Sequence, residues 1–255
     1  MGLLDGRVAI VTGAGSIREG LGNGKAVAIR FAREGARVFA IDINPAAVAE
    51  TEGQILREGG SVAVGVGDVS RKDDCVRLVG ECRDAFGSAT VLHNNVGIAV
   101  PGEVADIAEE AWRRAFAVNV DSMLFMCQAV VGGMIDAGGG SIINVSSVAS
   151  IRSFNAVSYS TTKGAVNSLT LTLAGRLARH HIRVNAILPG YIDTPLVAPV
   201  WQNDAIRQAN LRQVPLRRFG TAWEVASVAT FLASDEASYV TGALLPVDGG
   251  LTVGL

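Results

Sequence analysis

"VTGAGSIREGLGNGKAVA" (residues 11–28) places five glycines between Gly13 and Gly24. The apolar run RVAIV ends where this stretch begins, and the helical pattern KAVAIRFAREG closes it. A glycine-rich turn between a strand and a helix lets the backbone approach a phosphate, which the free N–H groups of the helix N-terminus attract. The spacing departs from the common G-x-G-x-x-G fingerprint, and a plain glycine-rich turn is the alternative interpretation. We expect a dinucleotide-binding loop.

The rest of the chain repeats this alternation of strand and helix. The Val- and Ile-rich runs are nearly continuous, as in parallel strands covered on both faces. We predict strands at 7–11, 37–41, 61–66, 90–93, 141–145, 183–188 and 244–247, and helices at 25–34, 46–57, 72–86, 109–136, 158–179 and 223–232. This order predicts an α/β fold, a doubly wound parallel sheet of about seven strands, in one domain over residues 1–255. Residues 193–220 look irregular and are expected to form a substrate loop.

Composition limits the possible functions. The chain has 255 residues, is 49% hydrophobic and has a formal net charge of −2, so it offers no basic stripe for nucleic acid. The longest apolar region, 115–135, contains Asn119, Asp121 and Gln128 and is expected to be a buried helix rather than a membrane span. Three cysteines form neither a disulfide framework nor a metal pattern. We expect a cytoplasmic protein that binds no metal, nucleic acid or membrane.

Asp42 ends the second predicted strand, 18 residues after Gly24. A carboxylate at this position can accept hydrogen bonds from the adenosine ribose and repels a 2′-phosphate. It therefore favours NAD over NADP, although a helix-capping role is the alternative. Arg18 could reach a phosphate, which weakens the expectation that NAD is preferred.

Tyr159 and Lys163 stand four residues apart in "YSTTK", on one face of a predicted helix. A free tyrosine has a pKa near 10, and a neighbouring ammonium group stabilises the phenolate and lowers that pKa. Two serines, Ser146 and Ser147, follow the predicted strand at 141–145 and could hydrogen-bond a substrate oxygen. The pattern indicates acid/base chemistry, although an amphipathic helix face alone would also explain Tyr159 and Lys163.

Taken in order, these motifs resemble the short-chain dehydrogenase/reductase family over most of the chain, from Arg7 to Gly250. The resemblance rests on "TGAGS…GNG", "GDVS", "NNVG", "VNV", "NVSS", "YSTTK", "LPGYIDTP" and "VTGALLPVDGG". It implies four catalytic residues: Tyr159 as general acid/base, Lys163 to lower its pKa and hold the nicotinamide ribose, Ser147 to orient the reacting oxygen, and Asn119 to bend its helix and anchor a water. It also implies contacts to the cofactor from Gly13, Ser16, Gly22, Asn23, Gly24, Asp42, Asp68, Val69, Asn95, Val96, Gly97, Tyr159, Lys163, Pro189, Gly190, Ile192 and Thr194.

Three features depart from the family pattern. The cofactor loop is five residues longer, with IREGL (17–21) inserted before Gly22. Val96 replaces the usual alanine. Ser147 lies twelve residues before Tyr159, where a spacing of thirteen is common in the family. Counting back thirteen residues from Tyr159 selects Ser146 instead. The spacing from the preceding asparagine selects Ser147, which we favour.

The leading hypothesis is an NAD-dependent dehydrogenase that interconverts a secondary alcohol and a ketone. A 3-oxoacyl carrier-protein reductase using NADP(H) and a non-catalytic dinucleotide-sensing protein are the alternatives; enoyl reductases of the superfamily space their Tyr and Lys more widely. The expected substrate surroundings are mostly apolar and favour a neutral alcohol or ketone; they comprise Val100, Val148, Ser153, Phe154, Tyr191, Leu196 and the loop to Arg212, and Trp201 could cover the substrate.

Two apolar helices suggest an oligomer. The stretch 115–131 is apolar around most of its circumference, and so is the helix from Ser158. Monomers rarely expose such a patch, so we expect at least a homodimer, with Met126 facing outward. The family resemblance implies a homotetramer. His93, within a predicted strand, is expected to be buried and hydrogen-bonded.

Overall fold

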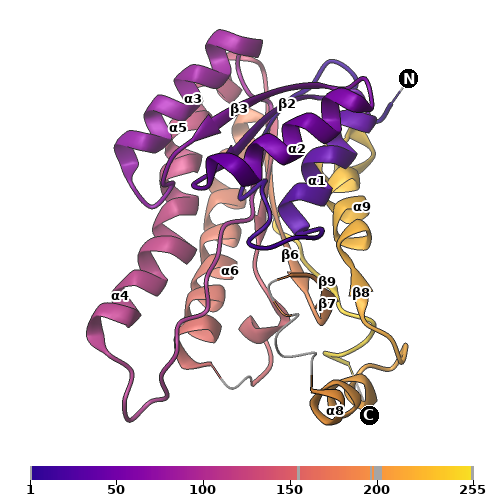
Figure 1. Ribbon diagram of the computed structural model, residues 1–255. Coiled ribbons are helices and arrows are strands. Elements are labelled where there is room, and N and C mark those ends of the chain that lie inside the picture. The colour runs from indigo at the N-terminus through magenta and orange to yellow at the C-terminus, as the bar shows by residue number, and fades with distance from the viewer. Residues whose placement is uncertain (1, 154–155, 196, 198–202, 254–255) are drawn as a thin grey trace.

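The computed structural model describes residues 2–153, 156–195, 197 and 203–253. Seven parallel strands form one sheet in the order β3-β2-β1-β4-β5-β6-β9 (Figure 1). The strands are β1 Val8–Thr12, β2 Arg37–Asp42, β3 Ser61–Val66, β4 Val91–Asn94, β5 Gly140–Val145, β6 Ile182–Pro189 and β9 Leu244–Val247. The predicted doubly wound sheet is confirmed.

Helices cover both faces of the sheet (Figure 1). One face carries α1 Asn23–Arg33, α2 Pro45–Arg57 and α9 Ala222–Ala233; the other carries α3 Lys72–Phe86, α5 Ser122–Asp136 and α6 Val157–Leu177. The central strand β1 is buried along its whole length, which explains why its sequence is apolar without alternation. Short 3₁₀ turns lie at Val148–Ser150, Ala178–His180 and Asp235–Ala237.

The strand order reverses at β1. The chain runs from β1 to β2 and β3 on one side, then crosses to β4 on the other. Ligands of open α/β sheets bind at such a switch point, outside the carboxyl ends of the strands. The predicted glycine loop and the segment after Asn94 both leave the sheet at this edge.

The predicted helix at 109–136 is one helical run with an interruption. It consists of α4 Glu109–Phe116, a π-helical turn at Ala117–Asp121, and α5. By length and composition alone this run could cross a membrane, but a core helix of a soluble protein meets the same criteria. Here Met123, Met126 and Val130 are buried against the sheet layer, as in a core helix.

The position of Met126 corrects one prediction. Met126 is completely buried, not outward-facing. The buried residues of α5 recur every three or four positions from Ser122 to Met134, which is the stripe that a helix on a sheet presents to the core. The outward side of α5 therefore includes Ile135, which is partly exposed, rather than Met126.

The segment 193–220 is more regular than predicted. β7 Ile192–Asp193 pairs in parallel with β8 Gly220–Thr221 and closes the base of the segment. Within it, α8 spans Asp204–Gln213 and begins after Asn203, whose side chain accepts hydrogen bonds from two backbone N–H groups. This asparagine is a helix N-cap signal that the sequence reading missed. Leu196 and Trp201 of this segment, like Phe154, lie outside the described residues.

Candidate active site

The glycine loop is built by close backbone approach. Gly13 has φ +63°, and a Cβ atom on Gly24 would lie only 2.0 Å from the Gly13 carbonyl oxygen. The Asn95 side chain donates to that same carbonyl at 3.2 Å, and the Asn95 backbone N–H donates to Thr12 Oγ1 at 3.1 Å. These contacts hold the loop against the end of β4, and they leave no space for a side chain at Gly24.

Two buried polar atoms in this loop, Ser16 Oγ and Asn23 Oδ1, have no hydrogen-bond partner among the described residues. The Ser16 hydroxyl can donate to a phosphate oxygen, whereas Asn23 Oδ1 is an acceptor and can take a hydrogen bond only from a donor such as a hydroxyl or a water. Gly22 precedes the first turn of α1 without a side-chain cap, so the N–H groups of that turn also point to the crevice. Orphaned polar groups are costly unless a ligand or water satisfies them. The loop therefore fits a dinucleotide pyrophosphate.

The inserted residues 17–21 extend from the glycine loop towards the substrate side. Leu21 packs against the core, and a Cβ atom on Gly20 would lie 2.9 Å from Pro195 Cγ. Gly20 has φ +122°, a conformation that L-residues rarely adopt. The insertion thus touches the residue that follows Thr194, while Arg18 is exposed.

Asp42 lies at the end of β2 beside the glycine loop. Its Oδ2 accepts the Gly15 N–H at 2.9 Å, and its Oδ1 accepts the Asn44 N–H at 3.0 Å. The carboxylate is only partly buried, so lone pairs remain for a ligand. Asn44, not Asp42, caps α2, which removes the helix-capping alternative.

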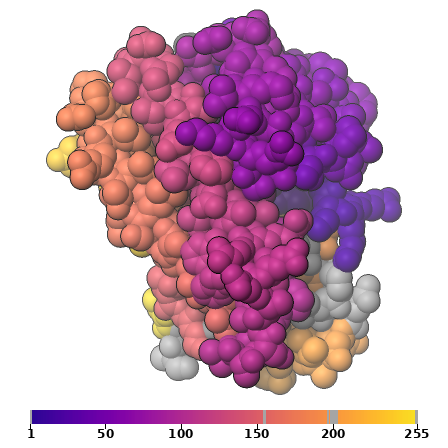
Figure 2. Space-filling model, turned by 90° about the vertical axis from the view of Figure 1, so that its left-hand side faces the viewer, coloured from indigo at the N-terminus to yellow at the C-terminus, as the bar shows by residue number. Residues whose placement is uncertain are grey.

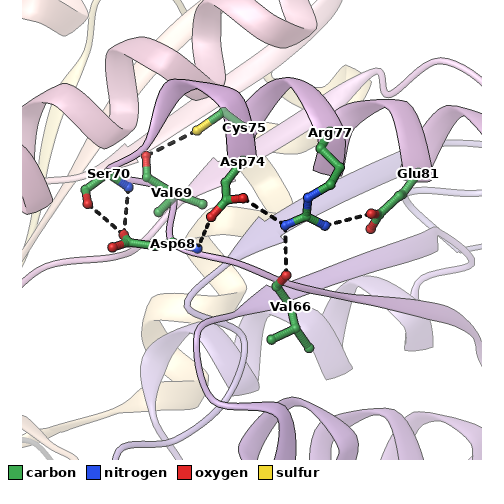
Figure 3. A network of polar contacts seen from close by, with 8 residues as sticks. All are labelled: Val66, Asp68, Val69, Ser70, Asp74, Cys75, Arg77 and Glu81. Atoms are coloured by element: carbon green, nitrogen blue, oxygen red, sulfur yellow. Dashed lines mark hydrogen bonds and ion pairs between the residues drawn. The ribbon is translucent and has the colours of Figure 1, made fainter.

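The loop after β3 is held by the first turns of α3 (Figure 3). The Asp68 N–H donates to Asp74 Oδ2 at 3.0 Å, and Asp68 Oδ1 accepts from both the backbone and the hydroxyl of Ser70. Arg77 donates to Asp74 and to the Val66 carbonyl oxygen. Val69 is nearly buried. Asp68 and Val69 therefore have a rigid backbone at the edge of the sheet where an adenine ring is expected.

The two candidate serines have different surroundings. Ser146 is 1% exposed, and its hydroxyl donates to the Lys163 carbonyl oxygen at 3.0 Å. Ser147 Oγ accepts the Ala149 N–H at 3.1 Å, and the interaction of its hydroxyl with Tyr159 lowers the pKa of that phenol. Ser146 thus ties β5 to α6, whereas Ser147 faces the phenol.

Tyr159 and Lys163 lie next to each other on α6. Lys163 Nζ is 5.6 Å from the centre of the Tyr159 ring and donates to the Val145 carbonyl oxygen at 2.7 Å. Burial lowers the pKa of Lys163 to about 8. Burial raises the pKa of Tyr159, and the hydrogen bond with Ser147 lowers it by less. The expected lowering of the Tyr159 pKa is therefore not produced by the protein's own groups, because desolvation dominates.

Asn119 sits in the π turn, completely buried. Its Oδ1 accepts the Ile98 N–H at 2.7 Å, and its Nδ2 donates to the Ile98 carbonyl and to Thr162 Oγ1, both at 2.9 Å. A Cβ atom on Gly97 would lie 3.1 Å from Lys163 Nζ and 3.5 Å from Asn119 Oδ1. The side chains of Lys163 and Asn119 therefore both adjoin Gly97 in the segment after β4, and Asn119 lies in the π-helical turn that interrupts its helix.

The remaining predicted contacts follow β6. Gly190 donates its N–H to the Val247 carbonyl oxygen at 3.0 Å, and a Cβ atom there would lie 2.7 Å from Asp248 Cα. Ile192 is nearly buried in the core and Thr194 is 9% exposed. Pro189, Gly190, Ile192 and Thr194 thus follow one another from the carboxyl end of β6 into β7 and the turn after it. Val96 packs beside Gly13, since a Cβ atom on Gly13 would lie 3.2 Å from Val96 Cγ2.

His93 is buried as predicted but not hydrogen-bonded. Neither ring nitrogen has a hydrogen-bond partner among the described residues, and burial lowers its pKa to about 3. Its ring meets the Phe31 ring edge-on at a centroid distance of 6.1 Å. The three cysteines are free and buried, and the described residues hold no group of three metal-ligating side chains.

A doubly wound sheet with a glycine loop at its switch point defines a dinucleotide-binding α/β protein, and the comparisons identify its family. A family model described as enoyl-(acyl carrier protein) reductase matches residues 18–252. Over 255 residues the chain is 39% identical to the 3-oxoacyl-(acyl-carrier-protein) reductase FabG of Thermotoga maritima, covering 98% of this chain and 99% of that protein. Over 254 residues it is 37% identical to a galactitol 2-dehydrogenase of Cereibacter sphaeroides, covering 98% and 96%.

Solved structures agree with these matches. A short-chain type dehydrogenase/reductase from Mycobacterium ulcerans superposes with a TM-score of 0.94 at 31% identity, covering 100% of this chain and 92% of that one. A gluconate 5-dehydrogenase from Burkholderia cenocepacia, in complex with NADP and tartrate, gives a TM-score of 0.92 at 32% identity, covering 99% and 97%. The chain belongs to the short-chain dehydrogenase/reductase family. It is an oxidoreductase of a family that binds a nicotinamide dinucleotide and acts on small molecules.

Proposed function

We propose that the protein transfers a hydride between NAD(H) and a secondary alcohol or ketone, with Tyr159 as the general acid/base. The observation that carries this proposal is the meeting of Ser147, Tyr159 and Lys163 at the carboxyl edge of the sheet. This group is continuous with the glycine loop, because Gly97 adjoins Lys163 and the neighbouring Val96 adjoins Gly13. Substrate and cofactor would therefore meet at one place.

A bound nicotinamide dinucleotide supplies the acceptor or donor of the hydride. In the oxidation, the Tyr159 oxygen takes the hydroxyl proton of the alcohol as the hydride leaves the carbinol carbon. In the reduction, the Tyr159 O–H donates that proton to the carbonyl oxygen. Ser147 Oγ accepts from the Ala149 N–H at 3.1 Å, which leaves its own O–H to donate to the substrate oxygen.

Lys163 and Asn119 hold the catalytic residues in place. The Val145 carbonyl oxygen, 2.7 Å from Lys163 Nζ, holds the lysine amine beside the Tyr159 ring, although burial still raises the pKa of Tyr159. Asn119 pairs with both backbone polar groups of Ile98 and with Thr162 next to Lys163. Asn119 therefore acts as a positioning residue that joins the π turn to the catalytic helix.

Asp42 supports NAD as the cofactor. Its carboxylate is fixed by the Gly15 and Asn44 N–H groups at the point where the adenosine ribose is expected. The negative charge of this carboxylate would repel the 2′-phosphate of NADP. Two observations oppose this choice: Arg18 of the insertion is exposed, and two structural relatives were solved with NADP.

A 3-oxoacyl carrier-protein reductase is the second candidate. It is favoured by the 39% identity to the Thermotoga maritima enzyme of that name, which extends over 98% of this chain. Asp42 argues against it if that activity uses NADPH. A non-catalytic sensing role is less consistent with the chain, because every catalytic position implied by the family motif is filled.

Two features support assembly into at least a dimer, and the family resemblance favours a homotetramer. Leu171 on α6 is 50% exposed and Ile135 on α5 is 38% exposed. Both helices lie on the same face of the sheet (Figure 1), on the side that Figure 2 turns towards the viewer, and a second copy packed there could cover each of these side chains.

The decisive experiment is Tyr159→Phe. We expect turnover of any alcohol that the wild-type protein oxidises to fall by about 10²–10⁴-fold, the usual contribution of a general acid/base. NADH should still bind, as followed by fluorescence titration, because the substitution removes only the phenol oxygen and leaves the glycine loop intact. Thr161→Ala, at an exposed position on the same helix, is the matched control. A variant that retains more than about a tenth of the wild-type rate would contradict the role assigned to Tyr159.

A further inference from the structure

A small apolar cluster lies beside the catalytic group, at the carboxyl end of β6. Val148, Leu188, Val214 and Leu251 are buried in it, and Tyr191 packs against it. These residues come from the turn after Ser147, the end of β6, the end of α8 and the C-terminal segment. The cluster forms the floor of the region in which a substrate held by Ser147 would lie.

Arg152 is an exposed residue that borders this cluster, because its side chain bonds the backbone of Leu251. The 3₁₀ turn Val148–Ser150, capped by Ser147, leads directly to it, and its own N–H donates to the Val148 carbonyl oxygen at 3.0 Å. Its guanidinium donates to the Leu251 carbonyl oxygen at 3.2 Å and to Gln213 Oε1 at 2.9 Å. The guanidinium thus links the end of α8 to the C-terminal segment. Arg152 itself lies five residues after Ser147 in the sequence.

The partners of Arg152 are all neutral. A backbone carbonyl and a side-chain amide orient the guanidinium, but no carboxylate among the described residues pairs with it. Asp248, on the same side, accepts instead from Gly250 and Thr252. A guanidinium has five N–H donors in a fixed fork, so donors remain for a further acceptor.

A second cation, Arg207, lies beside an aromatic pair next to this cluster. The Tyr191 and Phe219 rings meet edge-on at 6.1 Å, and the Arg207 guanidinium lies 5.4 Å from the centre of the Phe219 ring. Arg152 also lowers the pKa of Tyr191, which shows that its charge reaches that phenol, although burial raises the pKa by more. Arg207 makes no ion pair among the described residues.

We propose that Arg152 is a specificity-determining residue that binds an oxyanion on the substrate, so that the protein acts on hydroxy or oxo acids rather than on neutral alcohols. Arginine suits this role because its planar fork matches a carboxylate in a bidentate arrangement. The inference rests on the proposed function and names the substrate class for that site. It replaces the neutral substrate that the mostly apolar surroundings favour, because an apolar floor with one oriented cation at its rim suits a molecule with an apolar stem and an anionic end.

The first test compares paired substrates. Secondary hydroxy acids of increasing chain length, beginning with 3-hydroxybutyrate, are assayed beside their methyl esters with NAD and with NADP. Analogues ending in a sulfonate or a phosphate identify the preferred oxyanion. We expect the wild-type protein to favour an anionic member over its neutral counterpart by at least about tenfold in kcat/KM, the range of a hydrogen bond to a charged group. Esters turned over as well as the acids would overturn the proposal.

The second test removes the cation and keeps the shape of the contacts. Arg152→Gln retains an amide that can bond Gln213, while Arg152→Lys retains the charge without the fork. We expect kcat/KM for the preferred acid to fall by about 10- to 100-fold in Arg152→Gln, with KM rising more than kcat falls, and its ester to change little. Arg179→Gln, in the 3₁₀ turn that follows α6, is the control. An equal loss for acid and ester in Arg152→Gln would show a merely structural role.

Calorimetry separates this inference from the proposed function. The same acids and esters are titrated into the NADH-loaded wild-type and Arg152→Gln proteins, which needs no turnover. Acid binding that depends on Arg152 supports the inference even if no alcohol in the panel is oxidised, an outcome that would count against the proposed function. Acid binding that is equal in both proteins, or absent from both, would overturn the inference.

Discussion

Ser146 and Lys163 are joined by a hydrogen bond of 3.0 Å, from the serine hydroxyl to the backbone carbonyl oxygen of the lysine. This contact connects the end of β5 to the middle of the catalytic helix and occupies the hydroxyl of Ser146. The adjacent Ser147 instead meets Tyr159. Alternation along an extended backbone sends the two neighbouring side chains to opposite sides. The two serines therefore have separable roles.

Replacing each serine by alanine should separate these roles. Ser147→Ala is expected to lower kcat by about 10²-fold or more, since it removes a donor to the reacting oxygen, and to cost about 1 kcal/mol of stability for the lost cap of the 3₁₀ turn. Ser146→Ala should lower the free energy of unfolding by about 1–3 kcal/mol, because the buried Lys163 carbonyl loses a partner. Kinetics and urea unfolding of the same two preparations measure both effects. A larger loss of kcat in Ser146→Ala would exchange the assignments.

Cofactor preference should depend on Asp42. We expect NAD(H) to bind at least about tenfold tighter than NADP(H), because the carboxylate repels a 2′-phosphate. Asp42→Ala should reduce that ratio, while Asp84→Ala, at an exposed position on α3, should not. Dissociation constants for both cofactors are compared as a ratio, which cancels any common effect of loosening the Gly15 contact. Equal or tighter NADPH binding by the wild-type protein would contradict this prediction and favour Arg18 as a phosphate ligand.

His93 should make the protein sensitive to mild acid. Burial lowers its pKa from 6.5 to about 3, so between these values the unfolded chain binds a proton that the native protein excludes. The free energy of unfolding therefore falls as the pH drops below 6.5, by up to about 1.4 kcal/mol per pH unit from this group. Above pH 6.5 His93 is neutral in both the native and the unfolded chain, so this loss of stability is absent there.

Urea unfolding at pH 6.5, 5.5 and 4.5 tests the effect of His93. His93→Leu should lose stability less steeply over this range than the wild-type protein, with a difference of roughly 2–3 kcal/mol accumulated over two units. His181→Asn is the control, because His181 is exposed and has φ 58°, which asparagine tolerates. Parallel stability curves for the wild type and His93→Leu would show that His93 is not the acid-sensitive group.

Assembly should depend on the outward face of α6. Leu171→Glu places a charge on a side chain that is 50% exposed and is expected to lower the assembly towards the 26.5 kDa monomer in sedimentation experiments. Leu56→Glu is a matched control: Leu56 is 56% exposed on α2, which covers the opposite face of the sheet. A wild-type protein that is monomeric and fully active at micromolar concentration would refute the proposed oligomer.

The sequence alone was sufficient to predict the sheet and its motifs. Continuous Val- and Ile-rich runs separated by helical patterns can be satisfied only by parallel strands covered on both faces, and all seven predicted strands belong to the observed sheet. Glycine spacing in residues 11–28 likewise predicts close backbone approach, as observed between Gly24 and Gly13. Both signals are local, because they depend on periodicity and on the absence of a side chain.

Only the tertiary structure decided which neighbouring residues face which side. Met126 is buried rather than exposed because the stripe that α5 turns to the sheet depends on how the helix is rotated after the π turn, and an almost uniformly apolar sequence does not specify that rotation. Burial, which depends on the surrounding elements, raises the pKa of Tyr159 where sequence spacing predicted a decrease. Arg152 gained its place beside Tyr191 only because Gln213 and Leu251, distant in sequence, converge on it. Such contacts come from packing between elements, which residue spacing along one element does not encode.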